Sequence, residues 1–136
     1  MSGDLTYREG MGRYRSEPAS GRMWWWRVRG RLVDTKTGDI LETRRSSLAE
    51  ELALLLEQAD AGQLEALPSD ASPFPAYDTV GGEPWFVVVW NKYTLGGEQI
   101  ARSRSESLAR RCADALNRSH PRKLQRPDSR VRANWF

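Results

Sequence analysis

The feature that most constrains this chain is its similarity to itself. When the sequence is shifted by 60 positions, nine residues match within a window of about 32. The matching pairs are Trp25 and Trp85, Val28 and Val88, Ile40 and Ile100, Arg44 and Arg104, Ser47 and Ser107, Leu48 and Leu108, Ala49 and Ala109, Ala53 and Ala113, and Leu56 and Leu116. One unit of this length buries too little apolar surface to be stable alone. We therefore expect two similar units that share one core.

The first unit begins with a predicted strand from Met23 to Val33. Its residues alternate between two faces, which is typical of a strand that is buried on one side. One face carries Trp24, Trp26, Val28 and Leu32, and the other carries Trp25, Arg27, Arg29 and Arg31. Residues 34–39 contain Asp, Thr and Gly, which favour a turn, so residues 40–44 are expected to return as a second strand.

A helix is expected after this hairpin, because leucines recur at helical spacing and form one apolar stripe. The stripe consists of Leu48, Leu52, Leu55 and Leu56. Ser47 and Glu50 have the spacing of a capping box, which predicts that the helix begins at Ser47. The helix is expected to end near Gly62 or, more weakly, at Leu67.

The second unit repeats this plan. Residues 85–90 are apolar on both faces, which predicts a strand that is covered on both sides. Gly96-Gly97 is expected to form the hairpin turn, with residues 99–102 as the returning strand. Ser119-His120-Pro121 is expected to end the helix. The helical stripe of this unit consists of Leu108, Cys112, Ala115 and Leu116.

These patterns predict an α+β fold. A duplicated ββα unit is expected to form a four-stranded antiparallel sheet with two helices on one face, which leaves the other face open to a partner. The parts are an N-terminal arm (1–22), a single domain (23–120) with repeats at 23–67 and 83–120, a Pro- and Gly-rich linker (68–82) and a basic C-terminal tail (121–136).

Simple counts exclude several classes of protein. No stretch approaches the roughly 20 apolar residues that a membrane-spanning helix needs, so no membrane insertion is expected. The first residues lack the apolar core of a secretory signal, which favours a cytoplasmic protein. Cys112 is the only cysteine and His120 the only histidine, so neither an internal disulfide nor a Cys/His metal site is expected.

The same two residues argue against an enzyme. Acid-base and nucleophilic schemes would have to use His120, which lies beside Pro121 at a predicted helix end. Cys112 falls on the apolar stripe, where a thiol behaves as a small hydrophobic side chain. The glycine pairs lack the motif that binds phosphate in nucleotide-binding loops. We expect a non-enzymatic protein without a cofactor or a metal.

Charge is strongly segregated along the chain. The net charge of +3 at pH 7 is the sum of +4 over residues 1–31, −8 over residues 32–101 and +7 over residues 102–136. Basic ends favour an anionic partner such as DNA or RNA. The alternative is that the acidic middle folds against the basic ends of the same chain. The 18 arginines, against three lysines, favour bidentate contacts to phosphate or carboxylate, although a high-GC genome produces the same bias.

The most specific candidate site is the polar face of the first strand. Trp25, Arg27, Arg29 and Arg31 are expected in one row, with neighbours about 6.7 Å apart. Like charges in such a row repel one another. A polyanion relieves this repulsion, and Trp25 can stack on a base. The alternative is a solvated face whose arginines pair with an acid on a neighbouring strand, such as Glu42.

A second basic group lies in the C-terminal part of the chain. Arg110 and Arg111 are expected near the start of the second helix, where cations oppose the helix dipole, so their presence needs a further reason. Either an anionic partner binds there, or these arginines pair with Glu50, Glu51 and Glu57 of the first helix, within a monomer or across a dimer. The candidate nucleic-acid-binding residues of this group are Arg102, Arg104, Arg110, Arg111, Arg122, Lys123 and Arg126.

A third feature is a set of apolar side chains, Trp85, Val87, Val89 and Tyr93, which the alignment places on the same outer face as Arg27. They are either part of the core or a patch that binds another protein.

These features lead to two alternative functions. The first is a non-enzymatic nucleic-acid-binding accessory protein, compact and arginine-rich as suits a plasmid or phage of a high-GC bacterium. The second is a protein-protein interaction module, such as an inhibitor or assembly factor, that uses the aromatic sheet face.

Overall fold

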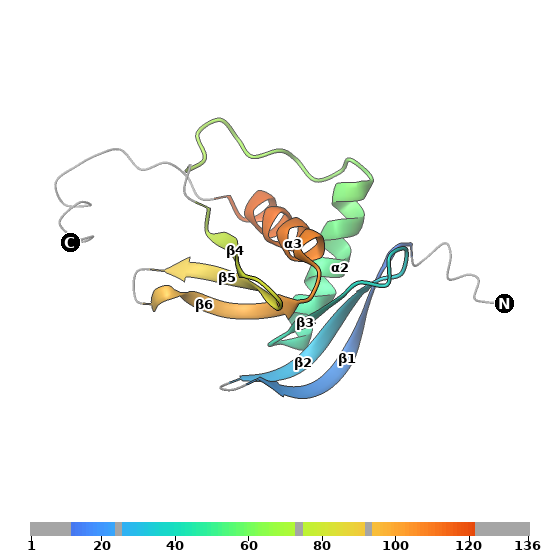
Figure 1. The fold of residues 1–136 in the computed structure, drawn as a ribbon. Coiled ribbons are helices and arrows are strands. Elements are labelled where there is room, and N and C mark those ends of the chain that lie inside the picture. The colour runs from blue at the N-terminus through green and yellow to red at the C-terminus, as the bar shows by residue number, and fades with distance from the viewer. Residues whose placement is uncertain (1–11, 24–25, 73–74, 92–93, 122–136) are drawn as a thin grey trace.

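A computed structural model describes residues 12–23, 26–72, 75–91 and 94–121 (Figure 1). This part of the chain forms two helices and one antiparallel sheet of six strands, so the predicted α+β class is confirmed. The elements are β1 (Tyr14–Met23), β2 (Trp26–Asp34), β3 (Ile40–Thr43), α2 (Ser46–Asp60), β4 (Tyr77–Gly81), β5 (Trp85–Asn91), β6 (Thr94–Ser103) and α3 (Glu106–Ser119).

The sheet has two more strands than the sequence predicts. Its order is β1-β2-β3-β6-β5-β4, with β3 and β6 paired at the centre. Along the described chain, three strands and a helix are followed by three strands and a helix. The predicted four-strand count is therefore wrong, and the duplicated ββα unit is not confirmed. The additional strands, β1 and β4, lie in the segments that the sequence pattern assigns to the N-terminal arm and to the linker.

Both additional strands lie at the edges of the sheet, which explains why they have no periodic signal in the sequence. β1 pairs with β2 alone, and Tyr14 is the one buried residue among its described side chains. The pairing of β1 shifts between Pro18 and Gly21, and proline is tolerated in a strand at such an edge. β4 pairs with β5 alone and has no buried residue. A strand that buries little has no need of alternating apolar residues.

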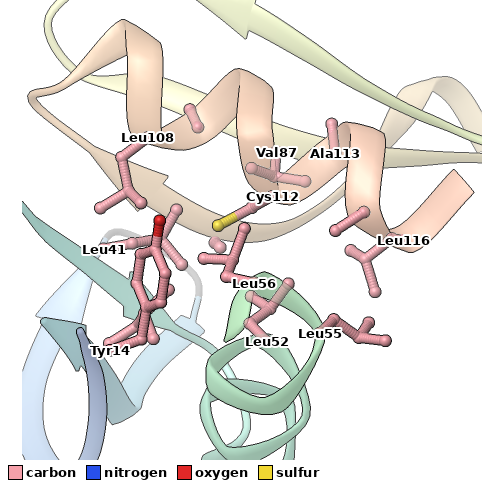
Figure 2. Close-up of a cluster of buried hydrophobic side chains, with 14 residues drawn as sticks. Tyr14, Leu41, Leu52, Leu55, Leu56, Val87, Leu108, Cys112, Ala113 and Leu116 are labelled. Carbon is pink, nitrogen blue, oxygen red and sulfur yellow. The ribbon is translucent and has the colours of Figure 1, made fainter. Parts of the chain in front are cut away.

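The two helices pack on the same face of the sheet and against each other (Figure 1). The predicted stripes are confirmed, because Leu52 and Leu56 of α2 and Cys112 and Leu116 of α3 belong to one buried cluster (Figure 2). Leu32 of β2 and Leu41 of β3 complete it from the sheet. Burial of each such leucine stabilises the fold by about 1.5–3 kcal/mol.

The offset of 60 that relates the two helices also relates the central strands β3 and β6, but it does not relate β2 to β5. Leu32 pairs with Leu41, and Val87 pairs with Ala101, which is 60 positions after Leu41. Leu32 and Val87 therefore occupy corresponding places, although 55 positions separate them (87 minus 32). The difference between the two offsets is an odd number, and an odd shift exchanges the two faces of a strand.

This shift corrects the prediction of an outer aromatic face. Val87 is fully buried in the cluster beneath the helices, and Trp85 packs against the same cluster. Val89 is half-buried, and Tyr93 lies outside the described residues. The apolar face of β5 is therefore core, which is the other interpretation that the sequence allows.

The predicted turn at Gly96-Gly97 is also wrong, because both glycines lie inside β6. Asn91 of β5 pairs with Thr94 of β6, so the hairpin is longer than expected. Gly97 has a φ of +82°, and a Cβ at this position would lie 3.1 Å from Cβ of Val88. Glycine is present here because the backbone conformation and the close approach of Val88 require it.

Candidate nucleic-acid interface

The alternation predicted for the first strand is confirmed in β2. Trp26, Val28 and Leu32 are buried, whereas Arg27 and Arg29 are exposed. Arg31 is partly exposed on the same side as these two arginines. Trp25, the fourth member of the predicted row, lies outside the described residues.

Arg27 and Arg29 line a hollow of about 600 Å³, which we call the arginine hollow. The arginines around it come from three segments of the chain: β1, β2 and the connection between β3 and α2. The remaining lining residues are Arg22, Trp26, Arg44, Arg45, Ser46 and Ser47. Five arginines from three segments therefore line one hollow.

Within the described residues, most of these arginines have no acidic partner. Arg44 lies 3.3 Å from a carboxylate oxygen of Glu98. Among the described residues, no acidic side chain pairs with the other four arginines, which are Arg22, Arg27, Arg29 and Arg45. Arg22 and Arg27 also lie directly opposite each other in the pairing of β1 with β2. Like charges at opposed positions destabilise a sheet, so an anion between them would stabilise it.

The start of α2 adds to the positive potential of the hollow. The predicted capping box is wrong, because α2 begins at Ser46 and its N-cap is Arg45, whose side chain accepts no hydrogen bond. The first turn of α2 contains no acidic residue. A guanidinium has no acceptor with which to cap a helix, so the positive end of the helix dipole remains without a side-chain partner.

The start of α3 has the opposite character. The hydroxyl of Ser105 accepts a hydrogen bond from the backbone N–H of Leu108 at 3.1 Å, and Glu106 lies in the first turn. Ser105 also donates to Asp39 at 3.1 Å. A second hollow of about 980 Å³ lies beside this helix start, and its charged lining residues are Asp39, Glu42, Glu83, Arg102 and Arg104. Three carboxylates among five charged groups make this hollow a poor site for an anion.

Of the four described arginines in the predicted C-terminal group, three have acidic partners within the chain. Arg102 lies 2.6 Å from Glu42, and Arg110 lies 2.7 Å from Glu106, one turn earlier on the same helix. Arg104 is exposed at the second hollow. Arg102 and Arg110 therefore meet acids of the same chain, but these are Glu42 and Glu106 and not the predicted Glu50, Glu51 and Glu57 of the first helix. Arg122, Lys123 and Arg126 lie outside the described residues.

Arg111 has a structural contact that the sequence did not indicate. It donates to the fully buried carboxylate of Asp34 at 3.1 Å and to the hydroxyl of Tyr14. Arg13 donates two further hydrogen bonds to Asp34, at 2.8 and 2.9 Å. Burial alone would raise the pKa of Asp34, but the hydrogen bonds from Arg13 and Arg111 outweigh it and hold the pKa well below its usual range. Arg111 therefore joins α3 to β2 and is not available to a partner.

The two residues considered for catalysis have ordinary surroundings. Cys112 is fully buried, and its burial raises the pKa of the thiol to about 12, which keeps it protonated at neutral pH. His120 follows α3, and its ring lies 3.0 Å from Glu51 on the surface. In the described part of the chain, no three His, Cys, Asp or Glu side chains are grouped so that they could hold a metal ion. None of the helices described here is long and apolar enough to cross a membrane.

The sequence prediction missed Arg22, Arg44 and Arg45. A signal existed for two of them, since Arg44-Arg45 immediately precedes a predicted helix, where cations are unfavourable without another reason. Arg22 could not be found in this way, because only the pairing of β1 with β2 brings it beside Arg27. No family model, curated protein or solved structure matches this chain, so the site is interpreted from its geometry and charge.

Proposed function

We propose that this protein is a non-enzymatic nucleic-acid-binding accessory protein that contacts phosphate groups with the arginine hollow. The observation that carries the proposal is the convergence of five arginines on one concave surface, four of them without an acidic partner among the described residues. Arginine forms bidentate contacts with phosphate oxygens, and clustered arginines are typical of surfaces that bind nucleic acids.

The arrangement of β2 extends the proposed interface beyond the hollow. Arg31 follows Arg27 and Arg29 on the same face of the strand, and its Nη1 atom lies 3.9 Å from a carboxylate oxygen of Glu17. This long contact on the surface leaves Arg31 able to exchange Glu17 for a phosphate. Trp25, Arg122, Lys123 and Arg126 remain predictions as further contacts.

The alternative function predicted from the sequence is a module that binds another protein. That alternative depended on an exposed aromatic face on β5, and Val87 of this face is fully buried. The arginine hollow, in contrast, is cationic, and DNA or RNA is a polyanion that suits it.

The test is the salt dependence of binding to single-stranded and double-stranded oligonucleotides, followed by fluorescence anisotropy. Each phosphate that the protein neutralises makes the slope of log K against log salt more negative by about 0.9 for duplex and about 0.7 for a single strand, so we expect affinity to fall as salt rises. Retention of no DNA or RNA at low salt would overturn the proposal. The ratio of the two affinities identifies the preferred form of the nucleic acid.

A further inference from the structure

We infer that the arginine hollow holds the terminal phosphate of a nucleic-acid strand, so that the protein recognises a strand end. This inference rests on the proposed function, since it names the group that the same site binds. The observation behind it is the arrangement of the five arginines around a concavity rather than along a line.

The convergence of the arginines favours a compact anion with more than one charge. Arg22 comes from β1, Arg27 and Arg29 come from β2, and Arg44 and Arg45 come from the connection between β3 and α2. A backbone that passes over a surface presents single negative charges in a row, one for each phosphodiester. A terminal phosphate carries about −1.5 to −2 charges at pH 7 on three oxygens, and several guanidinium groups can surround it.

The charge balance around the hollow supports the same conclusion. Glu98 is the one acidic side chain that forms an ion pair with a described lining arginine, so the five arginines retain a net charge of +4 with this carboxylate included. The uncapped start of α2 adds a further partial positive charge on the same side, as the lining by Ser46 and Ser47 shows. A phosphodiester would neutralise one of these charges, whereas a terminal phosphate neutralises nearly two.

The size of the hollow and its surroundings indicate how a strand would continue. A volume of about 600 Å³ lies within the range of small-molecule sites and admits a terminal phosphate together with its sugar. The adjacent open face of β2 carries Arg29 and then Arg31, which lies opposite Glu17 of β1 and Glu42 of β3. A strand that continued along β2 would meet Arg31 beside these two acidic residues, so the density of positive charge is highest at the hollow.

The test compares three single strands of one sequence that differ only in their ends: hydroxyl at both ends, phosphate at the 5′ end, or phosphate at the 3′ end. An internal fluorophore leaves both ends free, and anisotropy measures the affinity of the full chain. We expect one phosphorylated strand to bind about tenfold more tightly than the hydroxyl strand, since additional charge-assisted hydrogen bonds form. Arg45→Gln should reduce this ratio to about one, and thermal unfolding should confirm that the variant is folded.

Lys36→Gln is the matched control, because Lys36 is an exposed cation in the turn between β2 and β3 and does not line the hollow. It should keep the tenfold ratio. Equal affinity for all three strands, or a ratio that Arg45→Gln leaves intact, would overturn the terminal-phosphate inference and leave the proposed function standing. Binding of none of the strands would overturn the proposed function itself. Displacement of the phosphorylated strand by an equal concentration of a nucleoside monophosphate would show that a free nucleotide, and not a strand end, is the ligand.

Discussion

Arg22 on β1 lies directly opposite Arg27 on β2, and both side chains line the same hollow. Two cations at opposed positions on neighbouring strands repel each other, and neither has an acidic partner among the described residues. The remainder of the sheet and the packing of the helices stabilise the fold enough to tolerate this repulsion. Under the proposed function, a phosphate group between the two side chains would relieve this repulsion.

Reversal of the charges on β2 should separate binding from folding. Arg27→Glu combined with Arg29→Glu should weaken oligonucleotide binding by about 100-fold or more, because two attractive contacts become repulsive. Both side chains are exposed, so the thermal midpoint should change by less than about 4 °C. Anisotropy and circular dichroism measure the two effects. A collapse of folding would show instead that these arginines are structural.

Removal of the negative charge next to the hollow should have the opposite effect on binding. Glu98 pairs with Arg44 at 3.3 Å, and both side chains are about half exposed. Glu98→Gln releases Arg44 to a phosphate and should increase the affinity for an oligonucleotide by about threefold, while stability changes by less than about 1 kcal/mol. Asp114→Asn on α3 removes an equal charge away from the hollow and serves as the control. An unchanged affinity in Glu98→Gln would exclude Arg44 from the interface.

The buried carboxylate of Asp34 should be important for stability. Asp34→Asn removes the negative charge that faces Arg13 and Arg111 and should lower the free energy of unfolding by about 2–3 kcal/mol. This is less than for a fully buried ion pair, because the two arginine side chains are 28% and 30% exposed. Urea denaturation measures the change. Asp114→Asn, whose side chain is 61% exposed in an ion pair with Arg118, should cost less than about 0.5 kcal/mol.

Asp34 should also make the free energy of unfolding depend on pH in the acidic range. Its pKa in the folded protein is held below the unfolded value of about 3.9, so its contribution is fully present above that pH. The contribution is lost as the pH falls from about 4 towards the folded pKa. The difference in unfolding free energy between the original protein and Asp34→Asn should therefore shrink steadily between pH 5 and about pH 2. A difference that stays constant over this range would show that Asp34 is not ionised in the folded state.

The sequence by itself determined the features that depend on neighbours along the chain. The alternation of Trp26, Arg27 and Val28 identified a strand with one buried face, and the leucine stripe identified the buried side of α2. The spacing of Leu108, Cys112 and Leu116 did the same for α3. These predictions succeed because the period of a strand or helix decides which local residues share a face.

Only the tertiary structure decided which residues from distant segments meet. The edge strands β1 and β4 bury too little to leave a pattern in the sequence. Pairing with the central strands decides that Val87 occupies the place corresponding to Leu32, at an offset of 55 and not 60. The arginine hollow likewise exists only because the pairing of the strands brings Arg22 to Arg27 and because the chain turns into α2 at Arg45. Strand register and helix starts result from long-range packing, and no local period in the sequence records them.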